Sequence, residues 1–353
     1  MARYRPDVDL ASAVARTFDL GPATGPAVAV EGGLLNRMWR IDTTSGAYAA
    51  KQLAHTHPAA RDDYRRAHEV EMAAIAAGLV IPQPVPNPRD GGPLADIDTS
   101  LPIGPLTVLL HRWVDGERLD PSAPVSAEVA RTVAQDLARL HRIGLDPTAW
   151  PSYGIWHGAP TPETWSALAR RIEGAGIDLP WSRDLVDHES DLRAMAERVT
   201  SEDGFVGATI VSHRDADAKN LMMVDGRAIL IDWEVCGPTT VGHELGKSLL
   251  DLAGGSRGPI LGATADALLD GYSEIAGPLP EPSSAWFAEW LMACASFAAY
   301  NADLVLTGAD RREQDDRPSM ILSQLLPALL STATRWDELT EQLADLVSTA
   351  HPR

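Results

Sequence analysis

Three polar residues in the stretch from Val211 to Glu234 have the types and spacing that phosphoryl-transfer chemistry needs. Asp215, Asn220 and Asp232 each stand where an apolar, strand-like run stops. The segment from His213 to Asn220 reads His-x-Asp-x-x-x-x-Asn. In phosphoryl transfer, an aspartate in such a loop orients the attacking hydroxyl or accepts its proton. An asparagine five positions later ligates a metal ion that neutralises charge on the phosphate oxygens.

The sequence around these residues also predicts how two of them meet. Two apolar runs, 221–224 and 228–231, flank an Asp-Gly pair, which is typical of a β-hairpin. A hairpin brings its outer ends side by side, so we expect Asn220 and Asp232 to lie close together. An amide oxygen and a carboxylate at this spacing suit a hard divalent cation such as Mg²⁺.

A basic residue near the N-terminus is suited to nucleotide phosphates. Lys51 lies within a strand-like run and is flanked by small and apolar residues. A kinase uses such a lysine to hold the α- and β-phosphates of the nucleotide, and an acid on the next helix positions it. The helix expected over residues 59–77 offers Glu69 and Glu71. We favour Glu69 and leave Glu71 as the alternative.

Two glycine-containing segments resemble phosphate-binding loops to different degrees. Gly32 and Gly33 lie in a turn between strand-like runs, where backbone N–H groups can approach phosphates. Residues 242–248 end in Gly-Lys-Ser, but three residues separate the glycines where a P-loop has four, and a turn precedes them where a P-loop has a strand. We therefore expect Gly32 and Gly33 to contribute to nucleotide binding and residues 242–248 to begin a helix.

Composition narrows the classes of partner. The chain of 353 residues carries 30 Lys and Arg against 49 Asp and Glu, a net charge of −19. Without a basic stripe, nucleic acid is not expected as a partner. An acidic surface is compatible with a cationic small molecule, or with solubility alone. The two cysteines lack paired spacing, and charges occur throughout the first residues. The sequence also has no long apolar run. We therefore expect a cytoplasmic protein without a membrane segment.

The chain changes character near residue 113. Four strand-like runs precede that point, at residues 27–30, 38–41, 48–53 and 106–110. Helical periodicity dominates from residue 126 onward. We therefore expect an α+β, bilobal fold. Residues 1–113 would form a nucleotide-binding N-lobe with a small antiparallel sheet, and residues 114–353 a mainly helical C-lobe with the catalytic loop and the acceptor site.

With these residues placed, the chain resembles the aminoglycoside phosphotransferase family, a branch of the protein-kinase-like fold. The resemblance rests on Gly32-Gly33 with Asn36, Lys51, a helix acid followed by Ile81-Pro82, the Leu-Ala-Arg-Leu-His of residues 137–141, the His213 to Asn220 segment and the Ile-Asp-Trp-Glu of residues 231–234. It implies that Asp215 is the catalytic aspartate, that Asn220 and Asp232 hold Mg²⁺, and that Lys51 holds the nucleotide phosphates.

Three positions depart from the family's usual pattern and leave the acceptor open. Arg214 stands where the family usually has Gly, Asp217 where it often has His, and the Glu-Leu-Gly of residues 244–246 where it has Asp-Leu-Ala. The family also resembles kinases of choline, homoserine, macrolides and sugars. An Ala-Pro-Glu signature does not follow Asp232, which argues against a protein substrate.

The resemblance and the charge together predict an ATP-dependent O-phosphotransferase. It would move the γ-phosphate to a hydroxyl of a small molecule, with Mg²⁺ as cofactor and with GTP open as an alternative donor. A cationic, aminoglycoside-like acceptor, and hence antibiotic resistance by inactivation, is the leading expectation. The alternatives are a metabolic kinase of a sugar or amino alcohol, and an inactive kinase-like binding protein. A monomer or a homodimer is expected.

Overall fold

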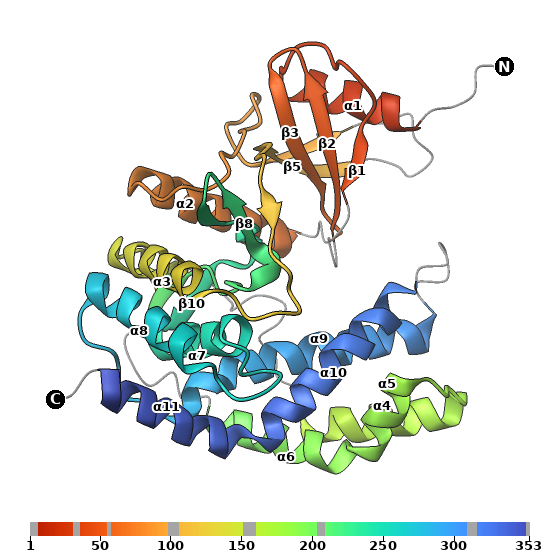
Figure 1. Ribbon diagram of the computed structural model, residues 1–353. Helices are drawn as coiled ribbons and strands as arrows, with labels where there is room; N and C mark the ends of the chain where they lie inside the picture. Colours follow the sequence, from red (N-terminus) through yellow and green to blue (C-terminus); the bar gives the residue numbers. More distant parts are fainter. Residues whose placement is uncertain are drawn as a thin grey trace. The chain divides into compact units, whose positions relative to one another are not determined.

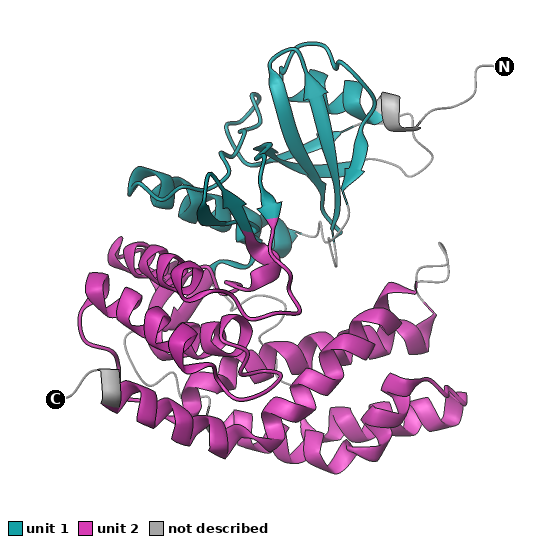
Figure 2. Cartoon of the chain, viewed as in Figure 1, with its two compact units in different colours: residues 1–117, 222–236 teal, residues 118–221, 237–353 magenta. Residues whose placement is uncertain are grey.

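The computed structural model describes residues 6–30, 36–54, 58–97, 106–150, 160–202, 209–308 and 316–350. The chain divides into two compact units (Figure 2). Unit 1 comprises residues 1–117 and 222–236, and unit 2 comprises residues 118–221 and 237–353. A small antiparallel sheet characterises the first and helices dominate the second, which confirms the expected α+β, bilobal kinase-like class. Within the described residues, no helix combines the length and apolar character that a membrane crossing needs.

Unit 1 is built around a five-stranded antiparallel sheet with the strand order β1-β2-β3-β5-β4 (Figure 1). Its strands are β1 (Val28–Val30), β2 (Arg37–Thr43), β3 (Gly46–Gln52), β4 (Leu94–Ile97) and β5 (Leu106–Arg112). Four of them were expected from the sequence. The edge strand β4 was not, because two of its four residues, Leu-Ala-Asp-Ile, are Ala and Asp, which are depleted in strands.

The two faces of this sheet bury different side chains, because successive residues of a strand point to opposite sides. One face, with Ala50 and Leu110, joins the main apolar cluster together with helix α1 (Pro6–Thr17). The other face, with Leu53 and Leu109, packs against Tyr64 of helix α2 (Pro58–Ala76). Lys51 pairs in register with Leu109, so its side chain emerges on the α2 face.

Unit 2 is mainly helical. Its helices are α3 (Ala127–Arg142), α4 (Pro162–Ala175), α5 (Pro180–Asp187), α6 (Glu189–Glu202), α7 (Val241–Leu252), α8 (Gly262–Ala276), α9 (Ala288–Thr307), α10 (Arg317–Thr334) and α11 (Trp336–Ala350). Helix α3 packs along α8, and α9 along α10. One continuous helix was expected over residues 183–199. The structure has a break at His188, whose ring contacts Asp191 at 3.0 Å across the start of α6.

Short strands frame the motif segment. Strand β7 (Thr209–Ser212) precedes it and pairs with β10 (Gly237–Thr240), where the sequence indicated only a turn. Strands β8 (Leu221–Val224) and β9 (Arg227–Leu230) are neighbours in a sheet with β6 (Glu117–Arg118), which confirms the expected hairpin. Asp225 and Gly226 have φ of 49° and 81°. Positive φ at both central residues is what a tight hairpin turn requires.

Candidate active site

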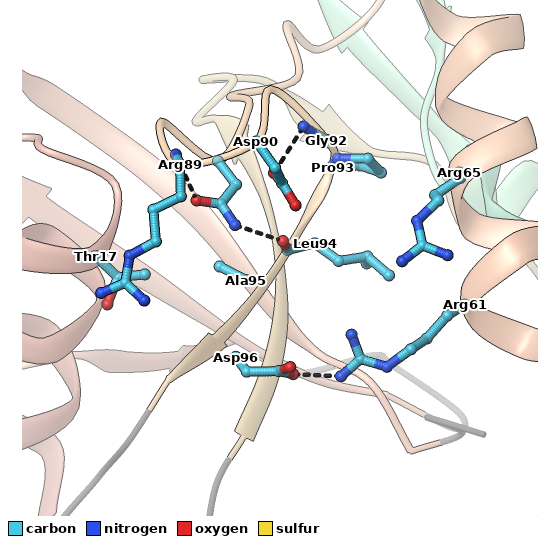
Figure 3. Close-up of a pocket in the computed structure, with 11 residues that line it drawn as sticks. Thr17, Arg61, Arg65, Arg89, Asp90, Gly92, Pro93, Leu94, Ala95 and Asp96 are labelled. Carbon is cyan, nitrogen blue, oxygen red and sulfur yellow. Dashed lines mark hydrogen bonds and ion pairs between the residues drawn. The ribbon is translucent and has the colours of Figure 1, made fainter. Parts of the chain in front are cut away.

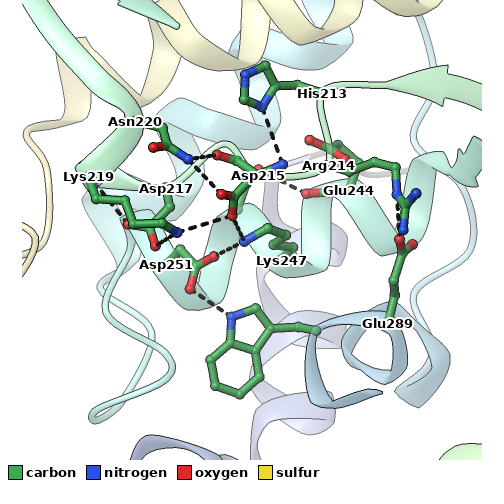
Figure 4. Close-up of polar contacts among 12 residues, drawn as sticks. His213, Arg214, Asp215, Asp217, Lys219, Asn220, Glu244, Lys247, Asp251 and Glu289 are labelled. Carbon is green, nitrogen blue, oxygen red and sulfur yellow. Dashed lines mark hydrogen bonds and ion pairs between the residues drawn. The ribbon is translucent and has the colours of Figure 1, made fainter. Parts of the chain in front are cut away.

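In unit 2, a tight loop presents the side chain of Asp215 directly after β7 (Figure 4). His213 is fully buried, and its Nδ1 accepts a hydrogen bond from the backbone N–H of Asp215 at 3.3 Å. Between them, Arg214 has a φ of 63° and its Nε donates to Oε1 of Glu289 at 2.9 Å. The buried imidazole and the buried ion pair thus hold the backbone of this loop on both sides of the turn.

Asn220 closes the loop onto Asp215. Its Nδ2 donates to Oδ2 of Asp215 at 2.7 Å and to the backbone oxygen of Asp215 at 3.0 Å. A single turn of 3₁₀ helix, η2 (Ala218–Asn220), places it there, and the side chain of Asp217 caps that turn by accepting from the N–H of Lys219. Because both contacts use the amide nitrogen of Asn220, its Oδ1 is the atom suited to a metal ion.

Two lysines face the same oxygen of Asp215. Nζ of Lys219 lies 3.1 Å and Nζ of Lys247 lies 3.3 Å from Oδ1. Burial alone would raise the pKa of Asp215, but the two ammonium groups outweigh it and hold that pKa well below the usual range. Asp215 therefore stands ready as a carboxylate that can accept a hydrogen bond from a hydroxyl group.

Lys247 belongs to the Gly-Lys-Ser segment, which forms the beginning of helix α7 as expected. The helix starts at Val241 after the cap residue Thr240, whose hydroxyl accepts from the N–H of His243 at 3.2 Å. The helix predicted for this segment is therefore confirmed, whereas the contact of Lys247 with Asp215 was not predicted. The spacing of Lys247 and Asp251 on one helix face was the available signal.

A buried histidine ties helix α3 to the end of β7. Nε2 of His141 lies 2.7 Å from the hydroxyl of Ser212, and Nδ1 lies 2.8 Å from the hydroxyl of Tyr272 on α8. Burial lowers the pKa of His141 to about 3, so the ring is neutral at physiological pH. This is the histidine of the Leu-Ala-Arg-Leu-His segment, and it supports the strand from which the loop begins.

In unit 1, Lys51 forms ion pairs with two carboxylates of the Ile-Asp-Trp-Glu segment. Its Nζ lies 2.8 Å from Oδ1 of Asp232 and 2.6 Å from Oε1 of Glu234. Asn36 donates to the other oxygen of Glu234 at 2.9 Å. Burial alone would lower the pKa of Lys51, but the two carboxylates raise it well above its ordinary value. Burial raises the pKa of Glu234 to about 7, against the opposing effect of Lys51.

These contacts differ from the expected pairing of Lys51 with Glu69. The side chain of Glu69 is exposed, whereas Glu71 is buried and lies 2.8 Å from Nε2 of His111 on β5. Residues two positions apart on a helix point about 200° apart, so only one of the two acids can face the sheet. The one that does, Glu71, is held by histidines, and these lower its pKa to about 2 against the effect of burial. Glu234 contacts Lys51 in place of a helix acid.

The remaining expected site residues lie as follows. Asp232 has a half-exposed side chain and a φ of 64°, and it immediately precedes the short helix η3 (Trp233–Val235), which packs against α2. Gly32 and Gly33 lie outside the described residues. The structure thus joins Asp215 with Asn220 in unit 2, and Lys51 with Asp232 in unit 1.

Backbone strain concentrates in the motif stretch. Four non-glycine residues among those described have positive φ, and Arg214, Asp225 and Asp232 are three of them. The hairpin turn accounts for the positive φ of Asp225, whereas at Arg214 and Asp232 such a sparsely populated conformation is of the kind that clusters at functional sites.

The donor set suits Mg²⁺ better than a transition metal. Within the described part of the chain, no group of three His, Cys, Asp or Glu side chains is arranged to hold a metal ion alone. The amide oxygen of Asn220, in unit 2, and the carboxylate of Asp232, in unit 1, are each an oxygen donor of the kind that Mg²⁺ prefers. Mg²⁺ is usually bound by one or two such oxygens together with substrate phosphates and water. Each of these two side chains is therefore chemically suited to a magnesium ion.

A separate pocket in unit 1 contains none of the expected site residues (Figure 3). It has a volume of about 210 Å³ and lies between α2 and β4. Arg61 at its edge donates to Asp96 and to the hydroxyl of Thr107, and Asn87 donates to the backbone oxygen of Leu94 at 2.9 Å. Because these polar groups of the lining form hydrogen bonds with one another, they have a structural role that requires no ligand.

Fold and site together define a kinase-like phosphotransferase. The model of the phosphotransferase enzyme family matches residues 27–278, which is more than half of the chain. The chain therefore belongs to this family of phosphotransferase enzymes. No curated protein shows a significant match to the sequence.

Solved structures share this fold over nearly the whole chain. A spectinomycin phosphotransferase in complex with ADP and spectinomycin has a TM-score of 0.62 at 12% identity, covering 90% of this chain and 94% of its own. An aminoglycoside phosphotransferase from Alicyclobacillus acidocaldarius has a TM-score of 0.54 at 16% identity, covering 99% and 97%. A choline/ethanolamine kinase family protein from Mesorhizobium loti has a TM-score of 0.57 at 16% identity, covering 96% and 98%.

Proposed function

We propose that the protein transfers the γ-phosphate of ATP to a hydroxyl group of a cationic small molecule, with Asp215 as the catalytic residue. The observation that carries this proposal is the carboxylate of Asp215, held by Asn220 on one oxygen and by two ammonium groups on the other. An ionised aspartate fixed in this way accepts a hydrogen bond from the acceptor hydroxyl and aims its oxygen at the γ-phosphorus.

The transfer has a simple balance of bonds. The hydroxyl oxygen forms a bond to the γ-phosphorus, the bond from that phosphorus to the β–γ bridging oxygen breaks, and ADP leaves. The hydroxyl proton passes to the carboxylate of Asp215. A carboxylate with a low pKa is a weak base, so Asp215 first orients the hydroxyl group. It accepts the proton late, when the bond from the hydroxyl oxygen to phosphorus is forming and the hydroxyl becomes more acidic.

Nucleotide binding falls to the second group of residues. Lys51 would hold the α- and β-phosphates, and Asn220 and Asp232 would hold Mg²⁺ through their side-chain oxygens. The bound ion supplies charge neutralisation on the phosphate oxygens. Lys51 already faces two carboxylates, so its ammonium group is kept charged and directed before the nucleotide arrives. The ADP in the related spectinomycin phosphotransferase structure supports ATP as the donor.

Charge favours a cationic acceptor. Around Asp215, three carboxylates, those of Asp215, Asp217 and Asp251, stand against two ammonium groups, those of Lys219 and Lys247. The whole chain carries a net charge of −19. Both features attract a polyamine-like substrate. The spectinomycin bound in the related structure is consistent with an amino-sugar antibiotic as acceptor and with inactivation by phosphorylation as the role.

A single assay tests this function. The protein is mixed with Mg-ATP or Mg-GTP and one acceptor at a time: aminoglycosides and spectinomycin, choline and ethanolamine, or neutral sugars. Released ADP or GDP is measured. Release with the first group alone supports the proposal, and release with another group alone reassigns the acceptor. If nucleotide binds but no acceptor yields product, the proposal fails.

Two substitutions of the same kind give the test a control. Asp215→Asn is expected to leave nucleotide binding intact and to remove phosphorylation by at least about 100-fold. Asp225→Asn changes an exposed turn residue at which asparagine also tolerates the positive φ, and it is expected to retain wild-type turnover. Wild-type turnover in Asp215→Asn would remove Asp215 from the mechanism.

A further inference from the structure

The chain uses lysine at only three positions. Lys51, Lys219 and Lys247 are its only lysines, so the other 27 of its 30 basic residues are arginines. Arginine also forms the exposed ion pairs, as in Arg171 with Asp303. Each of the three lysines instead contacts an acid of the motif stretch: Lys51 contacts Asp232, and Lys219 and Lys247 contact Asp215. The positions of two of these lysines already suggest a reason for them. Lys51 is suited to nucleotide phosphates, and Lys219 lies in the same loop as Asp215.

Lys247 reaches Asp215 from outside the loop. Asn220, His213 and Lys219 all contact Asp215 from within the same eight-residue segment, so they move with it. Lys247 comes from helix α7, and its ammonium group lies 3.3 Å from Oδ1 of Asp215. Its side chain is 15% exposed, against 37% for Lys219. Of these contacts, the one from Lys247 ties the carboxylate to a separate helix.

A second carboxylate and an indole hold Lys247 in place. Lys247 also forms an ion pair with Oδ2 of Asp251, one turn later on α7. The other oxygen of Asp251 accepts from Nε1 of Trp290 on α9 at 2.7 Å. Asp251 is 9% exposed and Trp290 is buried. Trp290, Asp251, Lys247 and Asp215 thus form a continuous chain of charge-assisted contacts, which is stronger than neutral hydrogen bonding.

Helix α7 is itself held close to its neighbour. A Cβ at Gly242 would lie 2.7 Å from the indole of Trp286, and a Cβ at Gly246 would overlap the backbone oxygen of Trp286. The two glycines are one turn apart and face the short helix η4 (Ser284–Phe287), so they allow the two backbones to approach. Close packing of two backbones therefore explains why glycines occur in this segment, and binding of a phosphate group is not needed to explain them. It also fixes the position from which Lys247 extends.

We propose that Lys247 is a positioning residue: held by Asp251 and Trp290, it fixes the carboxylate of Asp215 in the orientation that phosphoryl transfer needs. This inference rests on the proposed function of Asp215. Lys247 acts through Asp215, so its loss lets the carboxylate rotate within the loop. A catalytic group that is misplaced by about 1 Å can lower the reaction rate about 100-fold. We therefore expect the loss of Lys247 to lower kcat. The binding of nucleotide and acceptor is retained.

Four variants test the role of Lys247 in steady-state assays with the acceptor found active. Lys247→Met keeps the length of the side chain without its charge, and kcat is expected to fall 10- to 100-fold, with both KM values within about threefold of wild type. Lys247→Arg restores a cation and is expected to recover part of kcat. Trp290→Phe removes the N–H to Asp251 together with part of the buried ring, and it is expected to lower kcat by about 3- to 10-fold. Arg171→Met removes an exposed ion pair and serves as the control.

A double variant separates positioning from general damage to the fold. If Lys247 acts through Asp215, Asp215→Asn with Lys247→Met loses no more activity than Asp215→Asn alone, because coupled residues are non-additive. Further loss in the double variant would overturn the inference, as would a wild-type kcat in Lys247→Met. A loss confined to the acceptor KM would overturn it too, since Lys247 would then be a substrate-binding residue. If Lys247→Met does not fold, Lys247→Arg and Trp290→Phe decide, and wild-type kcat in both overturns the inference.

The same data keep this inference apart from the proposed function. Wild-type turnover in Asp215→Asn would contradict the proposed function, whatever the effect of the Lys247 variants. An inactive Asp215→Asn together with wild-type Lys247→Met leaves the function intact and removes only the positioning role.

Discussion

The side-chain amide of Asn220 donates to Asp215 twice, to Oδ2 at 2.7 Å and to the backbone oxygen at 3.0 Å. These two contacts join the residue proposed for catalysis to one of the two proposed for the metal. They orient the carboxylate relative to its own backbone, and they turn Oδ1 of Asn220 away from Asp215. The loop therefore couples the position of the proposed metal ligand to that of the proposed catalytic residue.

Replacing Asn220 tests this coupling. Asn220→Leu keeps a similar volume but removes both the donor and the oxygen ligand, so ADP release is expected to fall to near background at any Mg²⁺ concentration. Loss of a partner for a buried carboxylate is also expected to lower the free energy of unfolding by about 1–3 kcal/mol. Asn220→Asp keeps an oxygen ligand, loses the donor and adds a negative charge beside Asp215 that bound Mg²⁺ would offset, so it should retain more activity at high Mg²⁺. Equal loss in the two variants would argue against a metal ligand at this position.

The partner of Lys51 is tested by substituting two acids in parallel. Glu234→Gln removes one charge from the pair with Lys51 and is expected to raise the KM for ATP several-fold, whereas Glu69→Gln alters an exposed helix position and should change nothing. Lys51→Met should weaken nucleotide binding by more than 10-fold, since it removes the cation for the phosphates. Titration with a fluorescent nucleotide measures all three. A large effect of Glu69→Gln together with none of Glu234→Gln would show that Glu69 on the helix, and not Glu234, supports nucleotide binding by Lys51.

His141 predicts a pH dependence of stability. Its pKa is about 3 in the folded protein and about 6.5 when unfolded, so the unfolded chain binds more protons between these values. The stabilising contribution of the neutral ring is therefore complete above pH 6.5 and is lost as pH falls. The slope reaches at most about 1.4 kcal/mol per pH unit. Urea unfolding between pH 7 and pH 4.5 should show a shallower slope in His141→Gln than in wild type. The same substitution at the exposed His188 provides the comparison, and an unchanged slope in His141→Gln would contradict the prediction.

Two glycine substitutions test the close packing of helix α7. Gly246→Ala places a methyl group against the backbone of Trp286, so α7 must move. We expect a loss of about 1–3 kcal/mol in the free energy of unfolding, as for other overpacked sites, and a lower kcat because Lys247 moves with the helix. Gly174→Ala is the control, because a Cβ there meets nothing within 4 Å, and it should stabilise the protein by up to about 1 kcal/mol. Calorimetry and ADP release measure both, and a stable, fully active Gly246→Ala would show that α7 has room to adapt.

Much of the candidate site could be predicted because it is local. Asp215 and Asn220 are five residues apart, and the loop, the 3₁₀ turn and the hairpin after it follow from residue types at fixed spacing. The helix at residues 241–252 was also predictable, because the turn before it and the spacing of its glycines exclude a phosphate loop. The short strands β4 and β10 were not. Strand β10 begins with Gly-Pro and half of β4 is Ala and Asp, all residue types that are depleted in strands, and only pairing with β5 and β7 makes these segments strands.

The sequence by itself determined the order of strands, loop and helices around the proposed site residues, since motif spacing and helical periodicity are properties of near neighbours. The tertiary structure alone decided what those residues touch. Lys51 meets Glu234 across 183 positions and Lys247 meets Asp215 across 32, while Glu69 points to solvent. Such pairings depend on which face of a helix or strand is buried and on how closely two backbones approach. These are outcomes of packing the whole chain, and no spacing along the sequence encodes them.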